Sequence, residues 1–299
     1  MSLPRDLSDL KSTIGRRFRR PGPAAVFPKD PWKLINQLGT EHTGSGTDAG
    51  ATCTICTWSG PAFGGVRHTE SQVCPGCNSI ARDRFLFFCF IHRTPRSVGL
   101  RVLETSPRLS GEYRHAMRRW FAYTASDLDG RAHKGKIRID LQNMDLPNSS
   151  IDVLLTPHVL EHVPNTRQAL AEIHRVLAPG GRMYLQVPIL QGRTAPPDEP
   201  EFHGDNTPVF WRFGPTDLID TLRASGFSTT ALCLRQFYDA VATQLSPWQQ
   251  VHGEFAVDDI VRNCRVDDFR SIATAETGDR LGLHDAYQYI VFEAIKGKP

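Results

Sequence analysis

Four of the seven cysteines form two pairs whose spacing suits a metal site. Cys53 and Cys56 form one C-x-x-C turn, Cys74 and Cys77 form a second, and 17 residues separate the pairs. Each turn can direct two sulfurs at one point, so two turns supply the tetrahedral four-thiolate set of a structural zinc site. Gly76 lies in the second turn, where such a turn often needs a positive φ. Two disulfides are disfavoured in a cytosolic chain, and a redox C-x-x-C would not explain two copies, so we predict bound Zn²⁺.

A second pattern is a series of short apolar runs separated by amphipathic segments. Runs of this length, bounded by turn residues, indicate buried parallel strands joined by helices. The runs are Leu100–Glu104, Trp120–Ala125, Ile137–Leu141, Ile151–Thr156, Met183–Val187, Ser228–Leu234 and a last one near Tyr287–Ile295. They predict a doubly wound, Rossmann-like α/β fold with a seven-stranded, mostly parallel sheet, preceded by a small N-terminal zinc ribbon.

Polar side chains follow several of these runs, at the sheet edge where open α/β folds bind ligands. Asp127 comes 23 residues after Glu104. At this position a carboxylate can accept hydrogen bonds from both hydroxyls of a ribose. His158 and His162 follow the fourth run, and their ordinary pKa suits a general base. Glu161 stands between them, and an equally weighted alternative is that Glu161 and His162 only position the loop and take no proton from a substrate.

The segment that follows Pro188 adds a third histidine. His203 stands close to Glu199, Glu201 and Asp205 in a stretch rich in proline and turn residues. The segment follows the fifth run, and loops at this edge of an open α/β sheet border the ligand site, so His203 is a further candidate for catalysis. The acidic residues around it also suggest a metal, although their spacing is not regular.

The centre of the chain resembles a known family. The order D-L-x-x-M-x-L-P-x-S-S-I-D-V-L, then H-V-L-E-H-V, then A-L-x-E-I-x-R-V-L-x-P-G-G resembles class I S-adenosylmethionine (SAM) dependent methyltransferases of the type 11 kind. The resemblance runs from about Leu100 to about Leu232. The segment C-P-G-C-N-S-I-A-R-D-R-F also resembles a subset of these enzymes that carries a zinc knuckle before the catalytic domain.

The resemblance implies that SAM is the cofactor and which residues hold it. In the family the first loop is glycine-rich and lies against the methionine part of SAM, whereas this chain has Thr105 and Ser106 there and only Gly111 late in the loop. The position of Asp127 implies the ribose contact, and that of Asp140 and Leu141 the adenine contact. The implied cofactor-binding residues are Glu104, Thr105, Ser106, Asp127, Leu128, Asp140, Leu141, Pro157 and His158.

The expected function is therefore methyl transfer from SAM to a small-molecule or peptide-like O, N or C nucleophile. The zinc ribbon would be structural or would recognise the acceptor. Two alternatives stay open. One is RNA methylation of the ribosomal-RNA type, which the basic segment Arg16–Arg20 would assist. The other is a binding or scaffold protein, or an enzyme of different chemistry, which the glycine-poor loop favours.

Length and charge set the remaining expectations. The 299 residues divide into a basic, Pro-rich tail and linker (1–50), the zinc ribbon with a connecting helix (51–95) and the methyltransferase domain (96–299) with an insertion at about 238–284. The net charge is +3, and residues 1–30 alone contribute seven Lys/Arg minus three Asp, or +4. The rest of the chain is therefore about neutral, and a nucleic-acid partner is possible but not favoured. No apolar stretch suits a signal peptide or a bilayer span, so we expect a cytoplasmic protein with no membrane partner. A homo-oligomer is left open.

Overall fold

The computed structural model describes residues 25–40, 50–65, 72–129, 135–203, 206–245, 257–283 and 289–298. The Arg16–Arg20 segment and the middle of the insertion around Trp248 lie outside these ranges. The helices are α2 (Pro31–Thr40), α3 (Ala81–Arg93), α4 (Gly111–Trp120), η1 (Leu160–His162), α5 (Thr166–Val176), α6 (Pro215–Ala224), α7 (Arg235–Thr243), α8 (Val257–Arg262), η2 (Val266–Asp268) and α9 (Ala275–Arg280). The strands are β1 (Ala51–Thr52), β2 (Ser59–Gly60), β3 (Arg101–Thr105), β4 (Ala122–Asp127), β5 (Ile137–Arg138), β6 (Ile151–Pro157), β7 (Leu177–Gln186), β8 (Glu201–His203), β9 (Thr207–Val209), β10 (Phe227–Leu234), β11 (Phe269–Ala273) and β12 (Ile290–Lys296).

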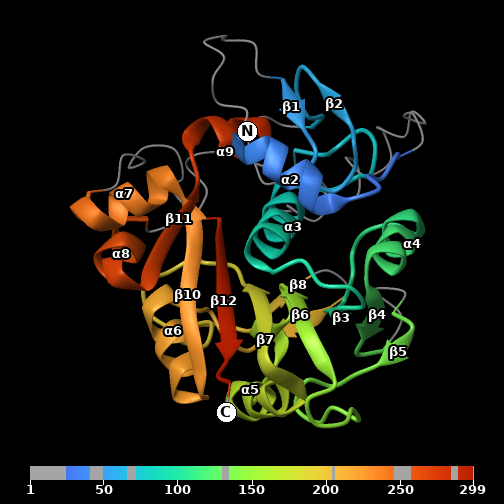
Figure 1. Ribbon diagram of the computed structural model, residues 1–299. Coiled ribbons are helices and arrows are strands. Elements are labelled where there is room, and N and C mark those ends of the chain that lie inside the picture. Colours follow the sequence, from blue (N-terminus) through green and yellow to red (C-terminus); the bar gives the residue numbers. More distant parts are fainter. Residues whose placement is uncertain are drawn as a thin grey trace, which may run out of the picture.

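A central sheet organises the described chain, with its strands in the order β11-β10-β12-β7-β6-β3-β4-β5 (Figure 1). Neighbouring strands pair in parallel except at β12, which is antiparallel to both β7 and β10. The predicted Rossmann-like, mostly parallel sheet is confirmed. The predicted number of seven strands is wrong, because the insertion contributes β11, which extends the sheet in parallel beside β10.

The third predicted strand is also shorter than expected. The run Ile137–Leu141 forms only the two-residue strand β5. The chain then turns at Asp140, whose carboxylate accepts a hydrogen bond of 2.9 Å from the backbone N–H of Gln142. A short Asp side chain commonly closes a turn in this way, so it competes with continuation of the strand.

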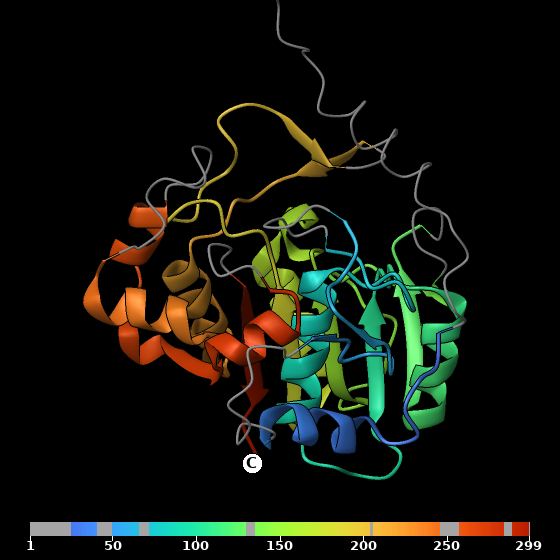
Figure 2. The same cartoon turned by 90° about the horizontal axis from the view of Figure 1, so that it is seen from above.

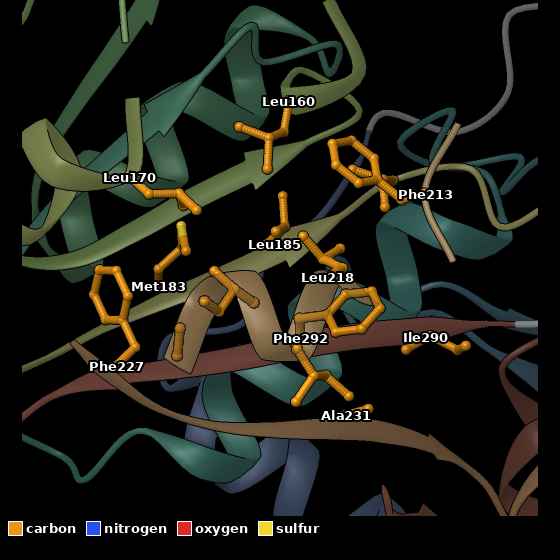
Figure 3. Close-up of a cluster of buried hydrophobic side chains, with 14 of the residues drawn as sticks. Leu160, Leu170, Met183, Leu185, Phe213, Leu218, Phe227, Ala231, Ile290 and Phe292 are labelled. Carbon is orange, nitrogen blue, oxygen red and sulfur yellow. The ribbon is translucent and has the colours of Figure 1, made fainter. Parts of the chain in front are cut away.

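One face of the sheet is covered by α5 and α6, whose apolar sides pack on β7, β10 and β12. Because the strands are buried on both faces, their side chains are apolar in both directions, as parallel sheets require. The side chains between these helices and the sheet belong to one buried apolar cluster. Figure 3 shows labelled members of it: Leu160, Leu170, Met183, Leu185, Phe213, Leu218, Phe227, Ala231, Ile290 and Phe292.

The opposite face is covered by α3, which lies between the sheet and the cysteine-bearing segment (Figures 1 and 2). All residues of Phe85–Ile91 are buried, and a helix that is apolar all round must be enclosed on every side. Phe90 packs on Tyr184 of β7 at a ring-centroid distance of 5.8 Å. The Arg93 guanidinium pairs with the buried Glu293 carboxylate at 2.9 Å. Within the described ranges, no helix is long and apolar enough to cross a membrane.

The chain order of the strands reverses between β3 and β6. From β3 the chain moves to β4 and β5 on one side, and it then returns to β6 and β7 on the other. In open α/β sheets, ligands bind outside the carboxyl ends of the strands at such a switch point. The loops after Thr105, Asp127 and Pro157 therefore border the expected ligand site.

Candidate functional site

The two C-x-x-C turns bring their four sulfurs together. Cys53 Sγ lies 3.7 Å from Cys77 Sγ, and Cys56 Sγ lies 3.6 Å from Cys74 Sγ. All four Sγ atoms lie within 4.8 Å of one another and all four residues are buried. A tetrahedron with Zn–S bonds of about 2.3 Å has edges of about 3.8 Å, so this arrangement fits Zn²⁺. All seven cysteines are free thiols in the structure.

Local backbone geometry positions these sulfurs. The Cys53 N–H donates to the Trp58 carbonyl at 3.0 Å, and the Asn78 N–H donates to the Cys74 carbonyl at 2.9 Å. The residue with the positive φ is Asn78 (60°), and Gly76 has no such φ, so that expectation was wrong. Gly76 is needed for space instead, because a Cβ there would lie 3.1 Å from Cys56 Sγ.

A buried arginine stands beside the cysteine cluster. Arg84 is fully buried, and its guanidinium donates to the carbonyls of Leu281 (2.6 Å), Ser79 (2.7 Å) and Gln72 (3.0 Å). It also lies 3.7 Å from the centre of the Phe63 ring. Burial lowers the pKa of this guanidinium, and the nearby Cys53 and Cys74 raise it. Arg84 matches the resemblance to the zinc-knuckle subset, but no role was predicted for it from the sequence.

At the switch point, two of the predicted cofactor residues meet. Ser106 Oγ donates to Asp127 Oδ1 at 3.0 Å, and the Leu128 N–H donates to the same oxygen at 2.9 Å. Ser106 has φ 48°, the left-handed conformation that glycine adopts most readily. Its N–H donates to the Ser126 carbonyl at 2.7 Å. The first loop therefore makes a left-handed turn without the glycine that the family usually has.

The other predicted cofactor residues are placed differently. Glu104 is buried and accepts hydrogen bonds from Tyr123 (2.6 Å) and Tyr113 (3.2 Å). Thr105 Oγ1 donates to a neighbouring strand carbonyl at 3.4 Å. Asp140 is exposed, whereas Leu141 is buried in the apolar cluster beneath α5. The structure thus groups Ser106, Asp127 and Leu128.

Burial raises the pKa of the Glu104 carboxyl from 4.5 to about 7. Since the folded state favours the protonated form, the stability from Glu104 is fully present below pH 4.5 and is lost as the pH rises through 7. Glutamine does not titrate, so we expect Glu104→Gln to abolish this pH-dependent loss of stability. The free energy of unfolding of the variant, relative to that of wild type, should therefore rise by up to about 3 kcal/mol between about pH 5 and 8. Urea unfolding at stepped pH measures it, with the exposed Glu276→Gln as control; parallel profiles for the Glu104 variant and wild type would contradict it.

A second polar cluster lies after β6, where all three histidine candidates meet. Glu161 is 1% exposed, and neither carboxylate oxygen has a hydrogen-bond partner among the described residues. Its Oε1 lies 3.5 Å from His158 Nδ1 and 3.9 Å from His162 Nε2. The His162 and His203 rings meet edge to face at a centroid distance of 5.3 Å. Burial raises the pKa of Glu161 to about 7, although the neighbouring His162 opposes this most among the nearby side chains and Arg82 does so to a smaller extent.

The loop between β7 and α6 closes over this cluster. It carries the β8–β9 hairpin, a separate two-stranded sheet that stands apart from the central sheet in the view of Figure 2. The Phe210 N–H donates to the Glu161 carbonyl at 2.8 Å, and the Trp211 indole N–H donates to the Pro164 carbonyl at 3.2 Å. The sequence named His158, His162 and His203 as separate candidates; the pairing of the hairpin with η1 was not predictable from spacing.

Comparison with known proteins addresses the family. Residues 112–185 match the methyltransferase domain family. An uncharacterised 37.1 kDa protein in transposon Tn4556 of Streptomyces fradiae is 47% identical over 49 residues. That stretch covers 16% of this chain and only 14% of the relative's length.

Solved structures with a similar fold include methyltransferases. A SAM-dependent methyltransferase from Mesorhizobium loti is 15% identical, covers 70% of this chain and 97% of its own, and has a TM-score of 0.41. The [4+2]-cyclase SpnF is 16% identical, with coverage of 94% and 100% and a TM-score of 0.43. The 1,6-didemethyltoxoflavin-N1-methyltransferase of Burkholderia thailandensis is 14% identical, with coverage of 73% and 79% and a TM-score of 0.39. Residues 112–185, from α4 into β7, match the methyltransferase domain, and the described chain has a Rossmann-like α/β fold.

Proposed function

We propose that this protein transfers a methyl group from SAM to a small-molecule or peptide-like acceptor. The observation that carries the proposal is the Ser106–Asp127 pair. It lies at the switch point of the sheet, and Asp127 lies within the segment that matches the methyltransferase domain. A carboxylate at the end of the second parallel strand suits the two ribose hydroxyls of SAM, which are both donors.

The chemistry asked of the protein is mainly positioning. The SAM sulfonium already activates the methyl group, so the protein must hold the acceptor in line and remove a proton where the acceptor is an O–H or N–H. His158, His162 and His203 remain the candidate bases, because the structure gathers them beside the carboxyl end of β6. The alternative of a fold without methyl transfer depended on the missing glycines. The left-handed turn at Ser106 supports catalysis over that alternative.

We further propose that Cys53, Cys56, Cys74 and Cys77 bind Zn²⁺. The sulfur separations of 3.6 and 3.7 Å support this, as does their complete burial. The module then has a structural role, because its apolar residues and those of α3 join one cluster with the sheet. With so little regular structure of its own, it depends on the metal for folding.

Replacing Asp127 by Ala should weaken SAM binding by about 100-fold. The variant loses charge-assisted hydrogen bonds to ribose, each of which is typically worth about 1.5–3 kcal/mol. Calorimetric titration of SAM and S-adenosylhomocysteine into the zinc-loaded protein measures the effect. Asp145→Ala, which removes an exposed carboxylate in the loop before β6, is the matched control. Failure of the wild-type protein to bind either ligand would contradict the proposed function.

A further inference from the structure

We propose that Glu161, His162 and His203 bind one divalent transition-metal ion, at a second metal site distinct from the four cysteines. One ligand atom from each residue lies within 4.8 Å of the others. Two residues come from η1 and the third from β8, about forty positions later in the chain. The inference goes beyond methyl transfer, and the binding of the metal does not depend on it.

The hydrogen bond of His162 leaves one ring nitrogen suited to a metal. Its Nδ1 lies 2.7 Å from the Pro208 carbonyl oxygen. A carbonyl can only accept, so Nδ1 carries the proton and Nε2 presents its lone pair. That Nε2 is the atom directed toward Glu161, at 3.9 Å from Oε1. Metal-binding histidines are usually oriented in this way, by a hydrogen-bond acceptor on the other nitrogen.

His203 has the same arrangement with a carboxylate. Its Nε2 lies 2.9 Å from Glu201 Oε1, and the other Glu201 oxygen pairs with Arg212 at 2.9 Å. The carboxylate accepts from Nε2–H, so Nδ1 is the nitrogen left for a metal. This is the carboxylate–histidine–metal pattern of many metalloproteins. Glu201 therefore orients a ligand and is not itself one of the three ligands.

Glu161 supplies the charge. Its carboxylate is 1% exposed, and neither oxygen has a hydrogen-bond partner among the described residues. A buried carboxylate without such partners costs several kcal/mol unless a cation compensates it. Main-chain bonds from the β9 side hold its backbone in place, since the Phe210 N–H donates to the Glu161 carbonyl at 2.8 Å. A polar group this buried and this unsatisfied indicates a ligand.

The donor set selects the class of metal. Two imidazoles and one carboxylate suit Zn²⁺, Co²⁺ or Fe²⁺, whereas Mg²⁺ and Ca²⁺ prefer oxygen ligands alone. Three protein ligands also leave at least one position open, as in catalytic zinc sites. His158, whose Nδ1 lies 3.5 Å from Glu161 Oε1, borders the same cluster and is the one of the three histidines that a bound metal would leave as a candidate base.

Metal content of the full chain tests the proposal. The purified protein is saturated with Zn²⁺, freed of excess metal and analysed by mass spectrometry. We expect two equivalents per chain for wild type and one for Glu161→Gln and for His203→Ala. The exposed His115→Ala on α4 is the matched control and should keep both. One equivalent in wild type, or two in both ligand variants, would overturn the proposal.

Cobalt separates the two sites by their ligands. Co²⁺ bound by four thiolates shows sulfur-to-metal charge transfer in the near ultraviolet, whereas a site of nitrogen and oxygen ligands shows only weaker visible bands. With Zn²⁺ already on the cysteines, added Co²⁺ should give visible bands without charge transfer, and these should be absent in Glu161→Gln.

Glu201→Gln tests the orienting role, because it alters the acceptor for His203 and leaves the three ligands in place. We expect its Co²⁺ affinity at this site to fall by about 10–100-fold. An affinity equal to that of wild type would show that Glu201 does not orient a ligand. Urea unfolding of each metal-free variant identifies any that fails to fold; Glu161→Gln, which removes a buried charge, should be at least as stable as metal-free wild type.

Discussion

Replacing Cys74 by Ser should lower the melting temperature of the whole protein by about 10–20 °C and abolish metal binding at the four-cysteine site. Zinc contributes about 10 kcal/mol or more to the folding of small zinc modules, and half of that would produce such a shift in a chain of this size. Serine keeps the shape of the side chain but is a poor ligand for Zn²⁺.

The effect should reach the sheet, because the module does not stand apart from it. The buried sulfurs, α3 and strands β3, β6 and β7 contribute to one apolar cluster. Loss of the metal therefore exposes one side of α3, the helix that covers a face of the sheet. Differential scanning calorimetry and the cobalt charge-transfer band together measure both consequences.

Cys264→Ala is the matched control, since it removes a buried thiol that is far from the cluster in sequence and has no part in it. We expect this variant to keep the charge-transfer band and to lose only the small stability of one buried side chain. If Cys74→Ser had the same melting temperature as Cys264→Ala and kept the cobalt charge-transfer band, the four cysteines would not be a structural metal site.

Much of this arrangement could be predicted from local sequence signals. Strand runs, the two C-x-x-C turns and the carboxylate 23 residues after Glu104 are short-range patterns, each with a direct physical cause. The sheet followed from them, apart from the strand count. β11 was missed because an edge strand of five residues inside an insertion has no pattern that distinguishes it from loop.

The functional clusters that were missed depend on long-range contacts. The sequence places Glu161 beside His158 and His162 at the mouth of the expected site, but only the approach of the β8–β9 hairpin to η1 shows that its carboxylate is buried between histidines. Glu104 was assigned to the cofactor, but Tyr113 and Tyr123 surround its carboxylate in the structure. Spacing along the chain shows which residues reach one edge of a sheet. It does not show which of their side chains already form hydrogen bonds with residues distant in the sequence.

Arg84 is the clearest example of a residue whose contacts depend on the fold. Its replacement by Met should destabilise the protein by about 3–5 kcal/mol. Methionine has a similar length and remains apolar, but it leaves the carbonyls of Leu281, Ser79 and Gln72 without their donor. Each buried, unsatisfied group costs about 1–3 kcal/mol. These carbonyls belong to three separated segments, so the guanidinium connects the cysteine module to the chain that follows α9.

The charge of Arg84 should matter as much as its hydrogen bonds. Four thiolates around Zn²⁺ carry a net charge of −2, and Arg84 is a buried cation beside them that interacts with Cys53 and Cys74. We therefore expect Arg84→Met to weaken zinc binding by at least about 10-fold, in addition to its effect on folding.

Arg84→Lys separates the two contributions. The lysine keeps the charge and thus most of the zinc affinity, but one ammonium cannot reproduce the fork that reaches three carbonyls. Its stability should fall between those of Arg84→Met and wild type. Arg96→Met, which breaks an exposed ion pair with Asp30 and a contact with the Trp32 ring, should cost about 1 kcal/mol or less. Urea unfolding measures the stability of these variants, and a zinc competition titration measures their affinity for zinc. If both Arg84 variants were as stable as wild type, the buried guanidinium would not contribute to folding. A loss of stability with unchanged zinc affinity would assign Arg84 to the carbonyls alone.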